Sequence, residues 1–177
     1  FLTYSKPQQY LAILLSWVLP PDSPYMTSIW SEGIIKWTSM TAYLPLCSLA
    51  GVVAYWRARQ GDSKKRIIAV CMVFALVPIL NSAFYALNSS YYARWFYMPV
   101  LLMCLATATA LERRDIDCIR GVRWYAGGVL LFLVACGLTP TKNSEGKWQI
   151  GLMGEPIRFW LVCLIAVACV LLTLWIV

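Results

Sequence analysis

The sequence predicts an all-α fold, a polytopic integral membrane helical bundle of about five transmembrane helices preceded by an N-terminal interfacial or re-entrant helix. Of its 177 residues, 60% are hydrophobic and only 13% are charged, whereas a soluble domain has about 25% charged residues. Several apolar stretches are long enough to cross the roughly 30 Å hydrocarbon core of a bilayer. The basic residues gather in two of the loops between these stretches. These observations exclude an ordinary water-soluble domain and a disordered chain.

The N-terminal segment, residues 1–37, is predicted to lie outside the cytoplasm. Its apolar stretch, 10–19, is too short to span a bilayer and is followed by Pro20 and Pro21, which stop a helix. We therefore expect this stretch to lie in the interface or to re-enter the membrane. The mixed, polar residues that follow are expected to form an ordered loop.

The transmembrane domain is predicted to cover residues 38–177. Its spans are placed at 38–56, 67–87, 91–111, 122–138 and 157–177. These runs are apolar on nearly all faces, as expected of helices that contact lipid on one side and other helices on the other.

Two sequence features inside the spans bear on helix packing. Small residues four positions apart allow close backbone approach; they are Cys47 and Gly51, Ala50 and Ala54, and Ala106 and Ala110. Prolines free a backbone carbonyl and can kink a helix; they are Pro45, Pro78 and Pro99. The spans are therefore expected to pack closely and to bend.

The net charge of +7 is interpreted as a topology signal. The loops 57–66 and 112–123 hold nine of the fifteen basic residues. Two predicted spans separate these loops, so both lie on the same face of the membrane. An excess of Lys and Arg marks the cytoplasmic face. We therefore place both loops in the cytoplasm, and we expect no nucleic-acid partner.

The composition excludes several kinds of chemistry. The chain has no His, so catalytic Ser-His-Asp and Cys-His arrangements and His-ligated metals are excluded. Its seven Cys form no CxxC motif, and most lie in apolar runs. We interpret them as packing residues rather than as disulfides or zinc ligands, and we predict no metal site.

The most informative segment is 78–99, where two predicted spans meet at the outer face. Arg94 is the only charged residue between Arg66 and Glu112. Its guanidinium suits a phosphate, although it could instead reach toward lipid headgroups beside an ordinary aromatic belt. Asn81 and Asn88 are seven residues apart and would share one helix face, to line a polar cleft or to join helices. The predicted substrate-binding residues are Asn81, Asn88, Tyr91, Tyr92, Arg94 and Trp95.

The run LNSAFYALNSSYYARWFYMPVLLM, together with the preceding span and basic loop, resembles YfhO-like bacterial membrane proteins. The resemblance covers residues 30–115 and depends mainly on Asn81, Asn88, Arg94 and Trp95. The family is similar to GT-C glycosyltransferases. It implies a sugar donor linked to polyprenyl phosphate, an envelope polymer such as lipoteichoic acid as acceptor, and a location in the bacterial plasma membrane. Arg94 would then bind the donor phosphate.

Catalysis by such an enzyme requires a carboxylate, which a divalent cation can assist. The weak candidates are Asp22 and Glu32 in the first outer segment. The chain begins with Phe1 and ends in an apolar run, so we expect a window of a longer protein with its catalytic carboxylate elsewhere. A transporter or flippase fragment and a non-enzymatic membrane scaffold remain alternatives.

Overall fold

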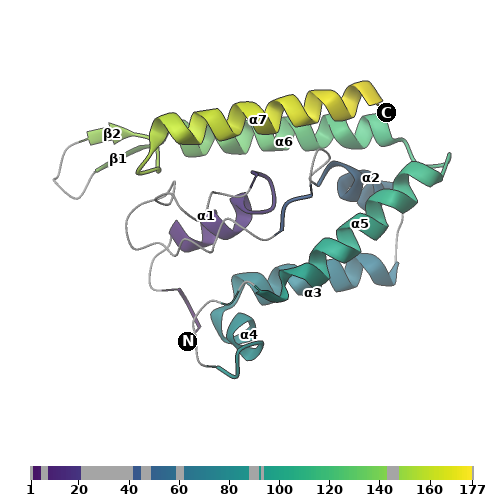
Figure 1. Ribbon diagram of the computed structural model, residues 1–177, viewed down its shortest axis with the longest axis horizontal. Coiled ribbons are helices and arrows are strands. Elements are labelled where there is room, and N and C mark those ends of the chain that lie inside the picture. Colours follow the sequence, from purple (N-terminus) through teal and green to yellow (C-terminus); the bar gives the residue numbers. More distant parts are fainter. Residues whose placement is uncertain are drawn as a thin grey trace.

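The computed structural model of the chain describes residues 2–4, 8–20, 42–44, 49–58, 62–87, 92, 94–142 and 148–176. Most of these residues are helical (Figure 1). In chain order the elements are α1 (Gln8–Leu15), α2 (Ala50–Ala58), α3 (Ser63–Leu76), α4 (Pro78–Ala83), the 3-10 helix η1 (Arg94–Phe96), α5 (Tyr97–Glu112), α6 (Cys118–Leu138), β1 (Pro140–Lys142), β2 (Trp148–Ile150) and α7 (Pro156–Ile176).

Three helices are long and apolar enough to cross a membrane, namely η1 with α5, α6, and α7. They match the spans predicted at 91–111, 122–138 and 157–177, and they support a helical membrane protein. Helix α6 begins earlier than predicted, at Cys118, because the Asp117 side chain caps it by accepting the Arg120 backbone N–H at 2.8 Å. Such a cap satisfies a donor that the first turn of a helix leaves unpaired.

The other two predicted spans differ from expectation. In the 38–56 stretch the described residues 42–44 are not helical, and α2 begins only at Ala50; the sequence places Pro45 between them, and proline disfavours a helical residue before it. In the 67–87 stretch Val77 is extended and separates α3 from α4, since Pro78 has no N–H to continue the ladder. The five-span count is therefore not confirmed.

Helix α1, Gln8–Leu15, overlaps the stretch 10–19 that was predicted to be interfacial or re-entrant. Its Ala12, Ile13 and Leu15 are buried in the protein. They join the packed core with Trp17, which lies just after the helix. The re-entrant character of this segment stays a prediction.

Helix α2 is short, but it packs against both α5 and α6 (Figure 1). A Cβ added to Gly51 of α2 would lie 2.4 Å from the Thr107 side chain of α5, and one added to Gly121 of α6 would lie 2.5 Å from the Cα of Ala54. These contacts leave room only for hydrogen on each glycine. They confirm the prediction that small residues in the first span allow close helix approach.

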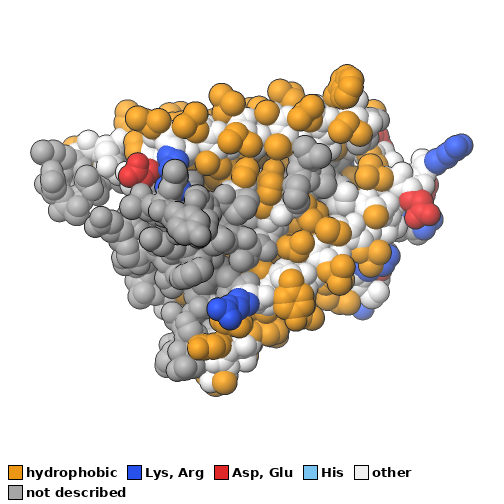
Figure 2. Space-filling model, in the orientation of Figure 1, with side chains coloured by type: hydrophobic (Ala, Val, Ile, Leu, Met, Phe, Trp, Pro, Cys, Tyr) orange, Lys and Arg blue, Asp and Glu red, His pale blue; other side chains and the backbone are white. Residues whose placement is uncertain are grey.

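Helices α6 and α7 form an antiparallel pair joined by the β1–β2 hairpin, in which Pro140 pairs with Ile150 (Figure 1). Gly137 lies against the Trp160 ring, because a Cβ placed on Gly137 would be 2.4 Å from a carbon of that ring. The outward side chains of the pair are large and apolar, and Figure 2 shows them covering this part of the surface. A bilayer would cover such a face.

Gly121 and Gly127 provide a matched pair in α6, because a Cβ on Gly127 would meet nothing within 4 Å. We expect Gly121→Ala to lower the free energy of unfolding by about 1–3 kcal/mol through overpacking against the α2 backbone. Gly127→Ala should be neutral or stabilising by up to about 1 kcal/mol, because Ala is the better helix former. Unfolding of the two purified variants in detergent, compared with wild type, measures both effects. Equal losses would contradict the close α2–α6 contact.

Candidate functional site

The predicted site lies at the corner where α4 turns into η1. Helix α4 ends at Ala83, and a turn over 84–87 follows with Ala86 and Leu87 at positive φ (49° and 61°). These left-handed residues turn the chain away from the helix axis. The single helix face expected to carry Asn81 and Asn88 is therefore not formed. Asn88 itself lies outside the described residues.

Asn81 is fully buried and connects the two sides of the corner. Its side-chain oxygen accepts a hydrogen bond from the backbone N–H of Tyr92 at 2.6 Å. Its side-chain nitrogen is buried and has no hydrogen-bond partner among the residues that the structure describes. Leaving a buried donor unpaired costs about 1–3 kcal/mol, so Asn81 both holds the corner together and retains an unused donor.

Trp95 is buried in an aromatic cluster. Its ring stacks on Phe84, with centroids 4.4 Å apart and an interplanar angle of 11°, and meets Phe74 and Phe96 edge-on. Within the described part of the chain, its indole N–H has no hydrogen-bond partner. Because protein rings surround it, Trp95 contributes packing and a donor, and it does not present an exposed face for a sugar to stack on.

Tyr92 lies at the edge of this cluster. Its ring stacks on Tyr85, with centroids 4.9 Å apart and an interplanar angle of 18°. Phe84 and Tyr85, which the sequence analysis did not single out, are therefore part of the site. The density of aromatic residues on both sides of the predicted turn was the signal that could have identified them.

Arg94 begins η1, and its side chain is exposed. It forms no ion pair with any residue that the structure describes. The structure thus brings together Asn81, Tyr92, Arg94 and Trp95. Tyr91, Asp22 and Glu32 lie outside the described residues.

The corner is equipped to bind oxygen acceptors. It offers the Arg94 guanidinium and two buried N–H donors, on Asn81 and Trp95. A guanidinium matches the geometry of phosphate or carboxylate. Across the described part of the chain, no cluster of three or more His, Cys, Asp or Glu could hold a metal ion. Of the three donor groups, on Asn81, Arg94 and Trp95, only the Arg94 side chain is exposed.

A second polar region lies at the opposite end of α5, where α2 meets the α5–α6 connection. Asp62 there caps α3 by accepting the Lys64 backbone N–H at 3.1 Å, and it also accepts the Tyr55 hydroxyl. These hydrogen bonds, that of Tyr55 above all, lower the pKa of Asp62 below its usual value. Residues of both basic loops meet in this region, because Arg57 lines one hollow together with Asp117 and Arg120.

Asn81→Leu tests the structural part of the Asn81 role. Leu is close in size but cannot accept from Tyr92, so the backbone N–H of Tyr92 loses its acceptor. We expect the free energy of unfolding to fall by about 1–3 kcal/mol. Asn81→Asp keeps an acceptor and serves as the control for the hydrogen bond. Unfolding in detergent measures both variants, and an unchanged stability for Asn81→Leu would contradict the connection across the corner.

Comparisons with protein-family models, curated proteins and solved structures find no match for this chain. The resemblance to YfhO-like proteins therefore stays a prediction. A function has to be argued from the corner and from the bundle that positions it.

Proposed function

We propose that this chain is the membrane-embedded part of a YfhO-like, GT-C-type glycosyltransferase in a bacterial plasma membrane. Its donor is a sugar linked to polyprenyl phosphate, and its acceptor is an envelope polymer such as lipoteichoic acid. The observation that supports the proposal is the corner itself. There an exposed guanidinium on Arg94 accompanies two buried donors, on Asn81 and Trp95, that have no acceptor among the described residues.

A phosphate supplies oxygen acceptors and the negative charge that the exposed Arg94 guanidinium prefers. Phe84, Leu87 and Tyr97 next to the corner expose large apolar side chains. Such a surface suits the hydrocarbon part of a lipid carrier. The proposal thus assigns the phosphate to Arg94 and the lipid chain to the neighbouring apolar surface.

The proposed reaction also needs a carboxylate to take a proton from the acceptor. The two candidates from the sequence, Asp22 and Glu32, lie outside the described residues. In this proposal the described bundle binds the donor, and a carboxylate elsewhere in the protein performs the proton transfer. A divalent cation could assist that carboxylate.

Two observations favour other functions. The break between α3 and α4 at Val77 makes a discontinuous helix, a feature that many transporters use at their substrate sites. The burial of Asn81 and Trp95 suits a scaffold in which these residues only pack. A flippase and a non-enzymatic scaffold are therefore the competing candidates.

Arg94→Gln in the full-length protein tests the phosphate role. We expect binding of polyprenyl phosphate to weaken at least about tenfold, since one charge-assisted pair contributes about 1.5–3 kcal/mol. Arg94→Lys keeps the positive charge but lacks the paired N–H donors of the guanidinium, so it should retain part of the binding. Arg114→Gln, an exposed arginine beyond the other end of α5, is the matched control. Binding to the purified protein and sugar decoration of the envelope are both measured.

The outcomes separate the candidates. Unchanged binding and decoration in Arg94→Gln would contradict the phosphate role and would favour the non-enzymatic scaffold. Lipid flipping by the purified protein in liposomes, without sugar transfer, would establish the flippase. Loss of both binding and transfer in Arg94→Gln, with Arg114→Gln unaffected, is the result that we expect.

The proposed orientation has its own test. Arg94 lies at the start of the candidate span and Arg114 follows the C-terminus of α5, and both side chains are exposed. We expect a membrane-impermeant maleimide to label Arg94→Cys in intact cells and to miss Arg114→Cys until the cells are opened. Labelling of the wild-type protein measures the background from the native cysteines. The reverse pattern would invert the orientation and place the corner in the cytoplasm.

A further inference from the structure

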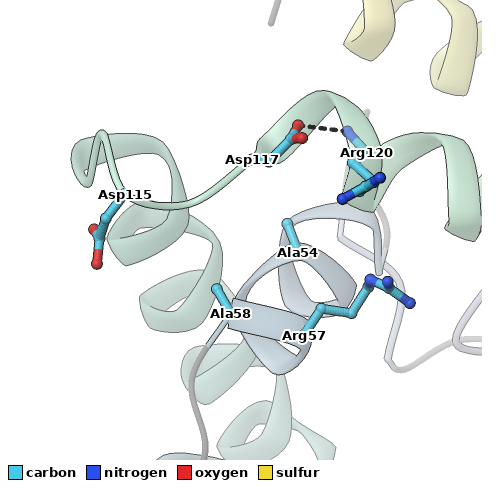
Figure 3. A pocket seen from close by; sticks show the side chains of 6 residues that line it. All are labelled: Ala54, Arg57, Ala58, Asp115, Asp117 and Arg120. Carbon is cyan, nitrogen blue, oxygen red and sulfur yellow. Dashed lines mark hydrogen bonds between the residues drawn. The ribbon is translucent and has the colours of Figure 1, made fainter.

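A polar hollow of about 440 Å³ lies at the end of the bundle opposite the corner. Its lining comes from α2, from the α5–α6 connection and from the first turn of α6 (Figure 3). The lining residues are Ala54, Arg57, Ala58, Asp115, Asp117 and Arg120. The two alanines leave space between the helices, and the charged residues surround it.

The close contact between α2 and α6 determines which charges meet here. Gly121 lies against Ala54. Arg57 follows Ala54 by three residues along α2, while Arg120 and Trp124 lie one residue before and three residues after Gly121. Residues three apart share a helix face. The tight crossing therefore brings two arginines and a tryptophan to one place, although the sequence separates them by more than sixty positions.

Arg57 is oriented by an aromatic contact. Its guanidinium carbon lies 4.9 Å from the centre of the Trp124 ring, a distance typical of a cation–π interaction. Stacking of this kind uses the flat face of the guanidinium and leaves its N–H edge free to bind an anion. In Figure 3 the side chains of Arg57 and Arg120 extend on the same side of α2, while Asp115 points away from them.

The neighbouring carboxylates have other partners. Asp117 accepts the backbone N–H of Arg120 at 2.8 Å, and Asp115 accepts from Arg113 at 3.0 Å. Neither Arg57 nor Arg120 forms an ion pair with a described residue. Asp117 keeps its negative charge and lines the same hollow. Because neither guanidinium is ion-paired with a described residue, the N–H groups of both remain available to an anion.

We propose that Arg57, Arg120 and Trp124 bind the headgroup phosphate of an anionic phospholipid in the leaflet at this end of the bundle. Trp124 belongs to a helix long enough to span a membrane and is 60% exposed near its first turn. Tryptophan is enriched at that depth. The outward side chains that follow on α6, such as Leu130 and Leu131, are exposed and apolar and would contact the acyl chains. This site is independent of the proposed glycosyltransferase activity.

A specific lipid-binding site differs from the general attraction of basic loops to anionic membranes. Both effects need positive charge, but only a site depends on which arginines carry it. Arg66 and Arg123 are exposed, belong to the same basic end and do not line the hollow. A double variant of these two therefore removes the same charge and leaves the site intact.

The test uses the full-length protein reconstituted in nanodiscs of phosphatidylcholine with a minority of phosphatidylglycerol. Native mass spectrometry then counts the retained lipids of each kind. For Arg57→Gln/Arg120→Gln we expect the preference for phosphatidylglycerol to fall about tenfold, with less than about a twofold change in Arg66→Gln/Arg123→Gln. Arg57→Lys/Arg120→Lys should fall between them, because the charge remains and the bidentate fork is lost. The Lys double variant also serves as a control in case the Gln double variant misfolds.

Three results would overturn the proposal. Equal losses in the two Gln double variants would show general electrostatic attraction. A preference for phosphatidylglycerol that the Arg57 and Arg120 changes leave unaltered would show that lipids bind elsewhere. Displacement of the retained lipid by millimolar inorganic phosphate would identify a site for a soluble anion instead.

Discussion

The packing of α2 is the constraint on which the rest of the structure depends. In a bilayer the lipid chains are as apolar as the side chains, so helices associate through close van der Waals contact rather than through hydrophobic burial. Gly51 and Ala54 provide that contact on two sides of a nine-residue helix, one against α5 and the other against α6. Because α5 and α6 are the helices that lead to the two polar regions, this short element determines where their charged residues lie.

The two ends of the bundle use arginine in different surroundings. At the corner, Arg94 follows a tightly packed aromatic cluster in which Asn81 and Trp95 keep unused donors. At the basic end, Arg57 and Arg120 border an open hollow, and Trp124 lies exposed beneath one of them. Both places leave a guanidinium without a carboxylate partner among the described residues. We propose a phosphate ligand for each, one at either end of the bundle.

Several features could be predicted from the sequence because they depend on local composition. Runs of apolar residues long enough to cross a bilayer identify η1 with α5, α6 and α7. The alanine and glycine spacing around Ala54 predicts close helix contact, and the contact is present. Other features depend on neighbours distant in sequence. Trp95 was expected to bind substrate, but its ring is buried because Phe84 and Phe74, from before the turn, fold onto it.

The sequence by itself predicted a helical membrane protein with five spans, three of which match helices long enough to cross a membrane, and it indicated that the basic loops share one end. Composition and run length carry this information, because a bilayer accepts only helices of sufficient apolar length. Pro78 already indicated where α3 breaks, whereas only the tertiary structure decided that Asn81 binds the Tyr92 backbone and that Arg57 meets Trp124. Those contacts depend on the angle and register of the helix crossings. Such crossings arise from side-chain packing between distant segments, which no local pattern encodes.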